Sequence, residues 1–291
     1  MKIFLTGASG FIGSRLLKRL VGHEILCVSR FQILRVPPNG VQWIIGDLGE
    51  PESLAFELKR FNPEVAIHLA WQGLPDYSKQ TCELNVNYSL SLLSLLRQSG
   101  VKRIVVAGSC FEYGDFQGQL CETSRVEPSG DYPIAKLRIL RGFQTVCDEE
   151  QIELVWARIF YSFGPGQRNI ALLPFVYHAL VNGERPVIRN PGAGHDFIFI
   201  DDVATALVSL VTTNSLRGVF NIGSGHLVSV AHFVNLIANQ CGSKFRVELT
   251  DDVRGFWASV EKIVTSTTWR PFYTLNEGIE QTIREIARSN S

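Results

Sequence analysis

The first thirteen residues constrain the fold more than any other stretch of the chain. A short apolar segment, residues 3–5, runs into a turn with evenly spaced glycines, Gly7, Gly10 and Gly13, and a helical pattern of apolar residues follows. Glycines at this spacing make a tight turn, let the backbone approach a ligand and let the helix pack closely on the strand. The unpaired amides at the helix start favour an anion. We therefore expect this turn to bind the diphosphate of a dinucleotide.

Charge and composition exclude several classes of partner. The chain has 291 residues, of which 28 are Lys or Arg and 28 are Asp or Glu, so no global field attracts nucleic acid or an anionic membrane. No run reaches the roughly 18 apolar residues of a membrane span, and the start of the chain does not resemble a signal peptide. The cysteines lie far apart, without metal-ligand spacing. We expect a cytoplasmic protein with reduced thiols that binds no nucleic acid, membrane or metal.

Strand-like and helical patterns alternate through the first 160 residues. The expected strands are 2–6, 24–29, 42–46, 65–70, 103–108 and 154–160, and the expected helices are 10–21, 51–61, 81–99 and 132–150. Continuous apolar strands separated by helices indicate a parallel sheet covered on both faces. The sequence therefore predicts an α/β fold, a Rossmann-type doubly wound parallel sheet with a smaller, discontinuous C-terminal substrate domain.

After about residue 160 the alternation loosens, and glycine-rich turns separate shorter elements. A helix over 201–213 and a strand over 219–222 are expected here, and both could return to the first sheet. The predicted dinucleotide-binding domain is then 1–160 plus about 196–224. The predicted substrate domain is about 161–195 plus 225–291.

A tyrosine and a lysine at a predicted helix start carry the chemistry. Tyr132 and Lys136 are four residues apart, which puts the phenol and the ammonium on one helix face; Asp131 is expected to cap the helix. A phenol with a pKa near 10 is a poor acid or base at neutral pH, and a neighbouring ammonium lowers that pKa. Ser109, at the end of the strand 103–108, would lie at the same sheet edge. The alternative is an ordinary surface pair and a loop serine.

Together these residues resemble the extended short-chain dehydrogenase/reductase family, whose members are nucleotide-sugar epimerases, dehydratases and reductases. The resemblance covers nearly the whole chain and is closest to the 4-ketoreductases that complete deoxysugar donors. Its motifs are the glycine turn, Gly46-Asp47-Leu48, His68-Leu69-Ala70-Trp71, the Asn85 motif, 108–114, Tyr132-x-x-x-Lys136, 158–166, 195–203 and 220–223.

The resemblance implies a role for each matched residue. Tyr132 is the acid/base, Lys136 holds the nicotinamide ribose and lowers the pKa of Tyr132, and Ser109 orients the reacting oxygen. The implied cofactor-binding residues are Gly7, Ser9, Gly10, Phe11, Ile12, Gly13, Ser29, Arg30, Asp47, Leu48, Leu69, Ala70, Trp71, Asn85, Tyr132 and Lys136. The candidate substrate-binding residues are Ser109, Cys110, Phe111, Tyr161, Gln167, Arg168, Asn169 and Arg254. The protein supplies positioning and proton transfer, and the cofactor supplies the hydride.

The first departure from the family pattern concerns the reaction. Dehydratases of this family carry an acidic pair directly after the catalytic hydroxyl residue. Here those positions hold Cys110 and Phe111, and Glu112 is one residue further on, where the turn is expected to point it elsewhere. We therefore do not expect dehydration.

The second departure concerns the cofactor. NAD-binding members place Asp or Glu at the end of the second strand, to bond the ribose hydroxyls. This chain has Ser29 and Arg30 there, and a hydroxyl and a guanidinium can bond a 2′-phosphate that a carboxylate would repel. NADP(H) is favoured, with NAD(H) as the alternative if Arg30 is only a solvated surface residue.

Further departures affect the substrate pocket. Tyr161 stands where the family has an asparagine that contacts the sugar nucleotide, which suggests a changed pocket. Arg254 is a second candidate for the substrate diphosphate, and its alternative is a surface arginine. His195 stands where the family often has arginine, and we interpret it as a structural residue at the domain junction.

The sequence thus predicts NADPH-dependent reduction of the 4-keto group of a nucleotide-activated 4-keto-6-deoxyhexose. A 4-epimerase with tightly bound NAD is the alternative, and a regulator that lost catalysis is disfavoured by the intact Ser109, Tyr132 and Lys136. The resemblance also implies a homodimer through the helices 81–99 and 132–150. The leucines of the first helix could instead face the chain's own sheet.

Overall fold

Seven parallel strands form the main sheet of the computed structural model, which describes residues 1–33 and 36–289. From edge to edge the strands are β11 (Gly218–Ile222), β7 (Glu153–Ile159), β5 (Arg103–Ser109), β4 (Val65–His68), β1 (Lys2–Thr6), β2 (Glu24–Ser29) and β3 (Val41–Ile45). The chain builds β1, β2 and β3 in one direction and then returns to β4 on the other side of β1. This reversal between β1 and β4 is where ligands bind in such sheets.

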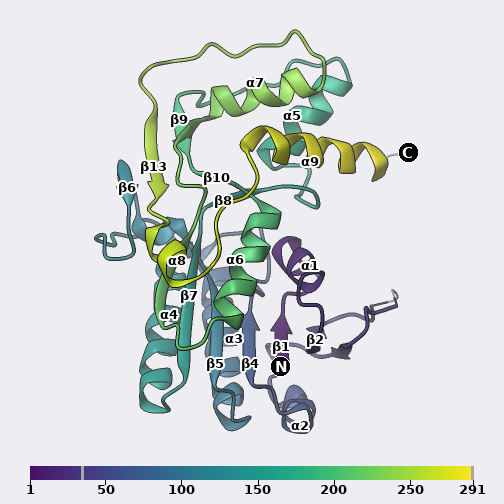
Figure 1. Ribbon diagram of the computed structural model, residues 1–291, viewed down its shortest axis with the longest axis vertical. Helices are drawn as coiled ribbons and strands as arrows, with labels where there is room; N and C mark the ends of the chain where they lie inside the picture. Colours follow the sequence, from purple (N-terminus) through teal and green to yellow (C-terminus); the bar gives the residue numbers. More distant parts are fainter. Residues whose placement is uncertain (34–35, 290–291) are drawn as a thin grey trace.

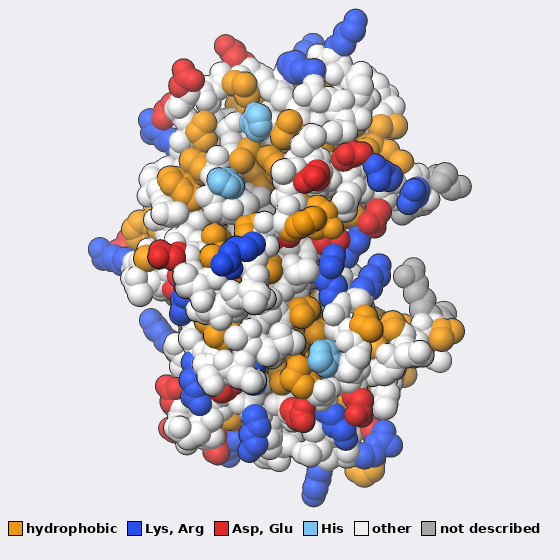
Figure 2. Space-filling view, in the orientation of Figure 1, with side chains coloured by type: hydrophobic (Ala, Val, Ile, Leu, Met, Phe, Trp, Pro, Cys, Tyr) orange, Lys and Arg blue, Asp and Glu red, His pale blue; other side chains and the backbone are white. Residues whose placement is uncertain are grey.

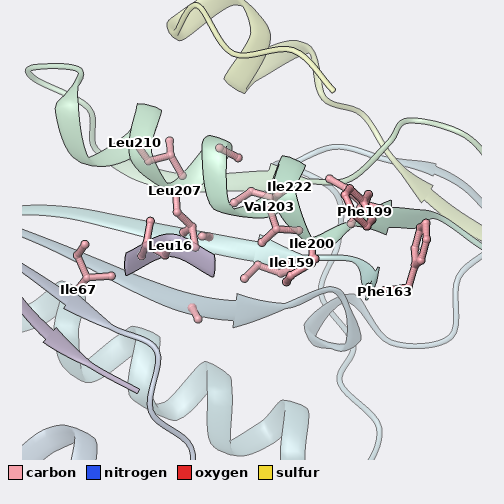
Figure 3. Close-up of a cluster of buried hydrophobic side chains, with 14 of the residues drawn as sticks. Leu16, Ile67, Ile159, Phe163, Phe199, Ile200, Val203, Leu207, Leu210 and Ile222 are labelled. Carbon is pink, nitrogen blue, oxygen red and sulfur yellow. The ribbon is translucent and has the colours of Figure 1, made fainter. Parts of the chain in front are cut away.

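Helices cover both faces of the sheet, which confirms the predicted doubly wound fold (Figure 1). The helices of one face are α1 (Phe11–Leu17) and α6 (Ile200–Thr212), and those of the other are α2 (Glu52–Phe61), α3 (Lys79–Gln98) and α4 (Asp131–Glu149). In β1, Ile3 packs in the first hydrophobic cluster and Phe4 in the second, as the period of a strand requires. Figure 3 shows Leu16 of α1 and Leu207 of α6 within the first cluster.

Most predicted elements begin and end close to the predicted residues. β1 and β2 have the predicted bounds, whereas β3 lies one residue earlier. The helix predicted over 10–21 ends at Leu17, because the amides of Arg19 and Leu20 both donate to the carbonyl of Leu16 and tighten the last turn.

Shorter elements form the second part of the molecule. A small sheet has the order β12 (Val228–Ser229), β9 (Ala193–His195), β13 (Arg254–Ala258) and β6 (Gly118–Leu120), and β8 (Tyr161–Phe163) pairs with β10 (Phe197–Phe199). The helices are η1 (Cys110–Tyr113, a 3₁₀ turn), α5 (Leu172–Val181), α7 (Val230–Gln240), α8 (Glu261–Ser266) and α9 (Leu275–Ser289). Figure 1 shows α5, α7 and α9 beyond the carboxyl ends of the main strands.

One buried carboxylate, that of Asp196, connects segments of the second part by hydrogen bonds. Asp196, between β9 and β10, is fully buried and accepts hydrogen bonds from the amide and hydroxyl of Ser224 (both 2.6 Å) and from the amides of Gly225 and Ala258 (both 3.0 Å). The donors follow β11 or lie in β13. Since β11 pairs with β7 of the main sheet, this carboxylate joins the two parts. The exact domain boundaries stay a prediction.

The surface shows no single-sign charge field on the face drawn in Figure 2, where basic and acidic side chains are interspersed. Within the described ranges, no helix combines the length and the hydropathy needed to cross a bilayer. Across the same residues, His, Cys, Asp and Glu side chains form no cluster of three or more that could hold a metal ion.

Candidate functional site

A cavity of about 780 Å³ lies at the carboxyl edge of the main sheet, where the strand order reverses. Its walls come from the ends of the first four strands and from residues 162–171 of the second part. Fourteen of the sixteen predicted cofactor residues line it: Gly7, Ser9, Gly10, Phe11, Ile12, Gly13, Ser29, Arg30, Asp47, Leu48, Leu69, Ala70, Trp71 and Asn85. The structure therefore brings the sequence motifs together into one elongated site.

The glycine turn has the geometry of a dinucleotide cradle. Gly7 has φ of +74°, and a Cβ there would lie 2.8 Å from the amide nitrogen of Ala70. A Cβ at Gly13 would lie 2.1 Å from the carbonyl oxygen of Gly7. No side chain caps the start of α1 at Gly10, so the first amides are available to an anion. The residues present thus fit a pyridine dinucleotide.

Ser29, the last residue of β2, and Arg30, which follows it, lie at the predicted cofactor end. Ser29 and Arg30 both line the cavity, and the Arg30 guanidinium lies 5.7 Å from the ring centre of Phe31. Asp47, on the neighbouring segment, accepts a hydrogen bond from the amide of Gly49 (2.8 Å). The guanidinium has no carboxylate partner among the ion pairs of the described residues.

Ser109, Tyr132 and Lys136 meet beside this cavity. Ser109 ends β5, and Tyr132 and Lys136 lie in the first turns of α4. The Ser109 hydroxyl lies close enough to the phenol of Tyr132 to lower the pKa of the phenol. Lys136 Nζ donates to the carbonyl of Ala107 (2.8 Å) and lies 4.5 Å from the ring centre of Trp71. None of these three catalytic candidates lines the cavity itself, whereas Trp71 does.

Burial shifts the pKa values of both Tyr132 and Lys136 in the free protein. It raises the pKa of Tyr132, Tyr77 adds to the increase, and the Ser109 hydroxyl opposes it. Burial also lowers the pKa of Lys136, to about 8. The predicted lowering of the Tyr132 pKa by Lys136 is therefore not seen. The ammonium is directed to the Ala107 carbonyl and lies 5.8 Å from the phenol ring centre.

The start of α4 differs from the prediction. Gly130 occupies the N-cap position, with φ of +96°, and no side chain caps the helix. Asp131 is the first helical residue rather than the cap. Its carboxylate there still complements the helix dipole.

A buried carboxylate fixes the turn that carries Ser109. Glu112, fully buried in η1, accepts a hydrogen bond from the amide of Ser109 (2.8 Å), while the Ser109 hydroxyl accepts one from the amide of Phe111 (3.2 Å). Glu112 is also bonded by Trp156 Nε1 (2.9 Å) and Arg158 Nε (2.8 Å). Its carboxylate is held by these buried donors, and its charge adds to the raised pKa of Tyr132. The signal for this role is the Ser-x-x-Glu spacing of a capping box, which the sequence analysis did not use.

The predicted substrate residues separate into two groups. Gln167 and Arg168 line the cavity. Asn169 is exposed beside them but is not part of the lining. Arg254 is exposed on β13 and forms an ion pair with Asp252 (2.9 Å), outside the cavity lining. This placement of Arg254 corresponds to the surface-arginine alternative.

Aromatic residues surround the catalytic phenol. Tyr132 makes edge-on contacts with Trp71 (ring centres 4.8 Å apart), Tyr77 (4.9 Å) and Phe111 (6.4 Å). Tyr77 is half exposed, and sequence reasoning missed it because it lies in a turn-rich segment without a motif. These rings exclude water from the phenol, which is the physical cause of its raised pKa.

The remaining substrate candidates lie next to these rings. Cys110 is buried against Phe160 and Phe256. Tyr161 stacks on His195 with ring centres 3.9 Å apart. Burial lowers the pKa of His195 to about 4, so its imidazole is neutral at neutral pH and packs as a ring. That geometry agrees with a structural role for His195.

Comparisons with known proteins agree with this geometry. The model of the "NAD dependent epimerase/dehydratase family" matches residues 3–223. A dTDP-4-dehydro-6-deoxyglucose reductase from Escherichia coli is 24% identical over 307 residues, covering 98% of this chain and 97% of the relative. A dTDP-6-deoxy-L-talose 4-dehydrogenase (NAD(+)) from Aggregatibacter actinomycetemcomitans is 26% identical over 235 residues, covering 77% of this chain and 85% of the relative.

A solved structure shares the whole fold. The UDP-glucose 4-epimerase of Thermotoga maritima, crystallised with UDP-glucose, superposes with a TM-score of 0.89 over 100% of both chains, at 22% identity. At this identity the likeness establishes the fold and not the reaction.

Truncation of Glu112 should destabilise the protein strongly. Glu112→Ala leaves the Arg158 guanidinium buried without its carboxylate, and breaking a buried pair in this way costs about 3–5 kcal/mol. We expect that loss in the free energy of unfolding measured in urea. Glu280→Ala is the control, because the Glu280–Arg284 pair is exposed and should contribute far less. Equal losses in the two variants would contradict this account.

Proposed function

This chain belongs to the NAD dependent epimerase/dehydratase family of nucleotide-sugar-modifying enzymes, and from that premise we propose that it is a 4-ketoreductase. In this proposal it reduces the 4-keto group of a nucleotide-activated 4-keto-6-deoxyhexose with NADPH. The observation that carries the proposal is the buried, uncharged phenol of Tyr132, which contacts the cavity-lining residue Trp71 at 4.8 Å between ring centres. A reductase needs a proton donor at this position, and a protonated phenol is one.

The residues of this chain would divide the reaction as follows. The cofactor, when bound, supplies the hydride to C4 of the sugar. The Ser109 hydroxyl orients the carbonyl oxygen, and the Tyr132 phenol donates a proton to that oxygen as the C4 alcohol forms. Lys136 lies in the turn after Tyr132, where it would hold the cofactor ribose. Glu112 takes no part in proton transfer, because its carboxylate is occupied by Ser109, Trp156 and Arg158.

A 4-epimerase is the alternative, supported by the fold shared with the Thermotoga maritima enzyme. Epimerisation at C4 begins with removal of a proton from the substrate hydroxyl, which needs a phenolate. The raised pKa of Tyr132 in the free protein disfavours that first step. The reductase names of the Escherichia coli and Aggregatibacter relatives point the same way.

The test of the proposed reaction is consumption of NADPH with a 4-keto sugar nucleotide. Wild-type protein should decrease the absorbance of the reduced nicotinamide, and Tyr132→Phe should lower the rate by about 10²–10⁴-fold, the usual contribution of a general acid. Cofactor affinity of that variant should be preserved. Tyr177→Phe is the matched control, since Tyr177 is a buried phenol on α5 outside the cavity.

Two results would contradict the reductase. One is an absence of turnover with dTDP-, GDP-, UDP- and CDP-linked 4-keto sugars. The other is interconversion of C4 epimers by protein that carries a bound, non-exchanging NAD, which would establish the epimerase.

We propose NADP(H) as the preferred cofactor, on the support of Ser29 and Arg30 in the cavity lining. The Aggregatibacter relative is named as an NAD(+) enzyme, so both cofactors have to be titrated.

NADPH should bind at least tenfold more tightly than NADH. Arg30→Ala should remove most of that difference, because a hydrogen bond to a charged group contributes about 1.5–3 kcal/mol. Arg125→Ala, an exposed arginine paired with Glu127, should change neither affinity. Tenfold tighter binding of NADH by the wild type would contradict the proposal.

We also propose a homodimer in which α3 and α4 of two copies meet. Leu92 and Leu96 belong to the chain's own core, so they are not available for this contact. Leu90 and Ile134 are instead exposed on the two helices, and Leu90 lies against Gly142 of α4. Leu90→Arg should therefore shift the mass measured by light scattering towards the monomer. Val187→Arg, at an exposed position far along the chain, should not. A monomeric wild type would contradict the dimer.

A further inference from the structure

Trp71 is the side chain that connects the dinucleotide cavity with the catalytic pair. It follows β4 and lines the cavity, whereas Tyr132 and Lys136 do not. Its ring nevertheless contacts both of them, with 4.8 Å between the ring centres of Trp71 and Tyr132 and 4.5 Å from Lys136 Nζ to the Trp71 ring. Tyr77 also lines the cavity and contacts Tyr132 (4.9 Å between ring centres), whereas the indole of Trp71 contacts both Tyr132 and Lys136.

The indole N–H of Trp71 is buried and has no hydrogen-bond partner. Other buried tryptophans of this chain satisfy the same group: Trp156 Nε1 donates to Glu112, and Trp269 Nε1 donates to the carbonyl of Asp202 and the hydroxyl of Thr205 (both 3.1 Å). An orphaned buried donor is uncommon in folded proteins, and it marks a place where a water or a ligand supplies the acceptor. The unpartnered indole N–H belongs to Trp71, a residue that lines the cavity.

Hydrogen bonds hold the main chain directly after Trp71 in place. Asn85 accepts a hydrogen bond from the amide of Gln72 (2.7 Å) and donates one to its carbonyl (2.9 Å). Donation to a ligand would require the indole to turn, so that its buried N–H reaches the cavity. A dinucleotide offers ribose hydroxyl and phosphate oxygens as acceptors along its length.

We propose that the Trp71 indole N–H donates a hydrogen bond to the bound dinucleotide, at the ribose beside the catalytic pair. The side chain of Trp71 is then a binding residue whose donor is unsatisfied only in the free protein. The inference rests on one part of the proposed function, namely that the cofactor is a pyridine dinucleotide. It does not depend on which sugar is bound or on the direction of the reaction.

The deciding variant is Trp71→Phe, which removes the N–H and keeps an aromatic ring. NADP⁺ and NAD⁺ are titrated separately by calorimetry. For the cofactor that the wild type prefers, the dissociation constant of the variant should be about five- to tenfold higher than that of the wild type, as expected for the loss of one neutral hydrogen bond. The melting temperature of the free variant should fall less than that of Trp269→Phe, because the N–H removed has no partner in the free protein and only ring contacts are lost.

Trp269→Phe is the matched control and should show the opposite pattern. It removes an indole N–H whose acceptors lie within the protein, so the melting temperature of the free protein should fall. Its dinucleotide affinity should be unchanged, because Trp269 is buried outside the cavity lining.

Nuclear magnetic resonance of ¹⁵N-labelled protein observes the hydrogen bond directly. The indole signal of Trp71, identified by its loss in Trp71→Phe, should move downfield when NADP⁺ or NAD⁺ is added. The Trp269 signal should not move.

Three results would overturn the inference. The first is a dissociation constant of Trp71→Phe for the preferred dinucleotide that equals the wild-type value. The second is a Trp71 indole signal that does not move when either dinucleotide is added. The third is weaker binding accompanied by a loss of free-protein stability as large as that of Trp269→Phe. A wild type that binds neither dinucleotide overturns both proposals, whereas tight binding without turnover of any 4-keto sugar overturns the reductase alone.

Discussion

The reversal of strand order between β1 and β4 is the constraint on which the rest of this molecule depends. It leaves a gap at the carboxyl edge that is filled on one side by the turn after β1 and on the other by residues 69–71. The two segments approach so closely that a Cβ on Gly7 would lie 2.8 Å from the amide nitrogen of Ala70. A glycine at position 7 is thus required by the neighbouring backbone as well as by its positive φ. The cavity, the phosphate cradle and the position of Trp71 all follow from this single crossing.

Desolvation governs the chemistry on the other side of that gap. The rings of Trp71, Tyr77 and Phe111 keep water from Tyr132, and burial is the main cause of the raised pKa of its phenol. Behind the reacting groups, the Glu112 carboxylate fixes the Ser109 turn through main-chain and side-chain donors. The site is therefore held rigid by a buried ion pair and kept dry by aromatic side chains.

The sequence was most informative where local patterns and global fold agree. β1 and β2 are buried, continuous apolar strands, and their bounds were predicted from that pattern. The candidate cofactor residues were predicted from the family resemblance, and the shared edge of the parallel strand ends explains why the structure brings them together. The sequence was less informative about contacts between segments that lie far apart in the chain. The three-residue strand β6 pairs with β13, more than a hundred residues later, and Arg254 is neutralised by Asp252 of its own segment rather than directed to the cavity. Neither pairing has a sequence period from which it could be derived.

Asp196 has a consequence for how the sequence of the second part of this molecule can diverge. Three of its four hydrogen-bond donors are main-chain amides, at Ser224, Gly225 and Ala258. Main-chain donors are present whatever side chain is attached, so the junction constrains the path of those segments far more than their residue types. The aspartate itself is the demanding position, since it alone supplies the acceptors. Side chains of the second part can therefore be exchanged during evolution while the second part keeps its position on the main sheet.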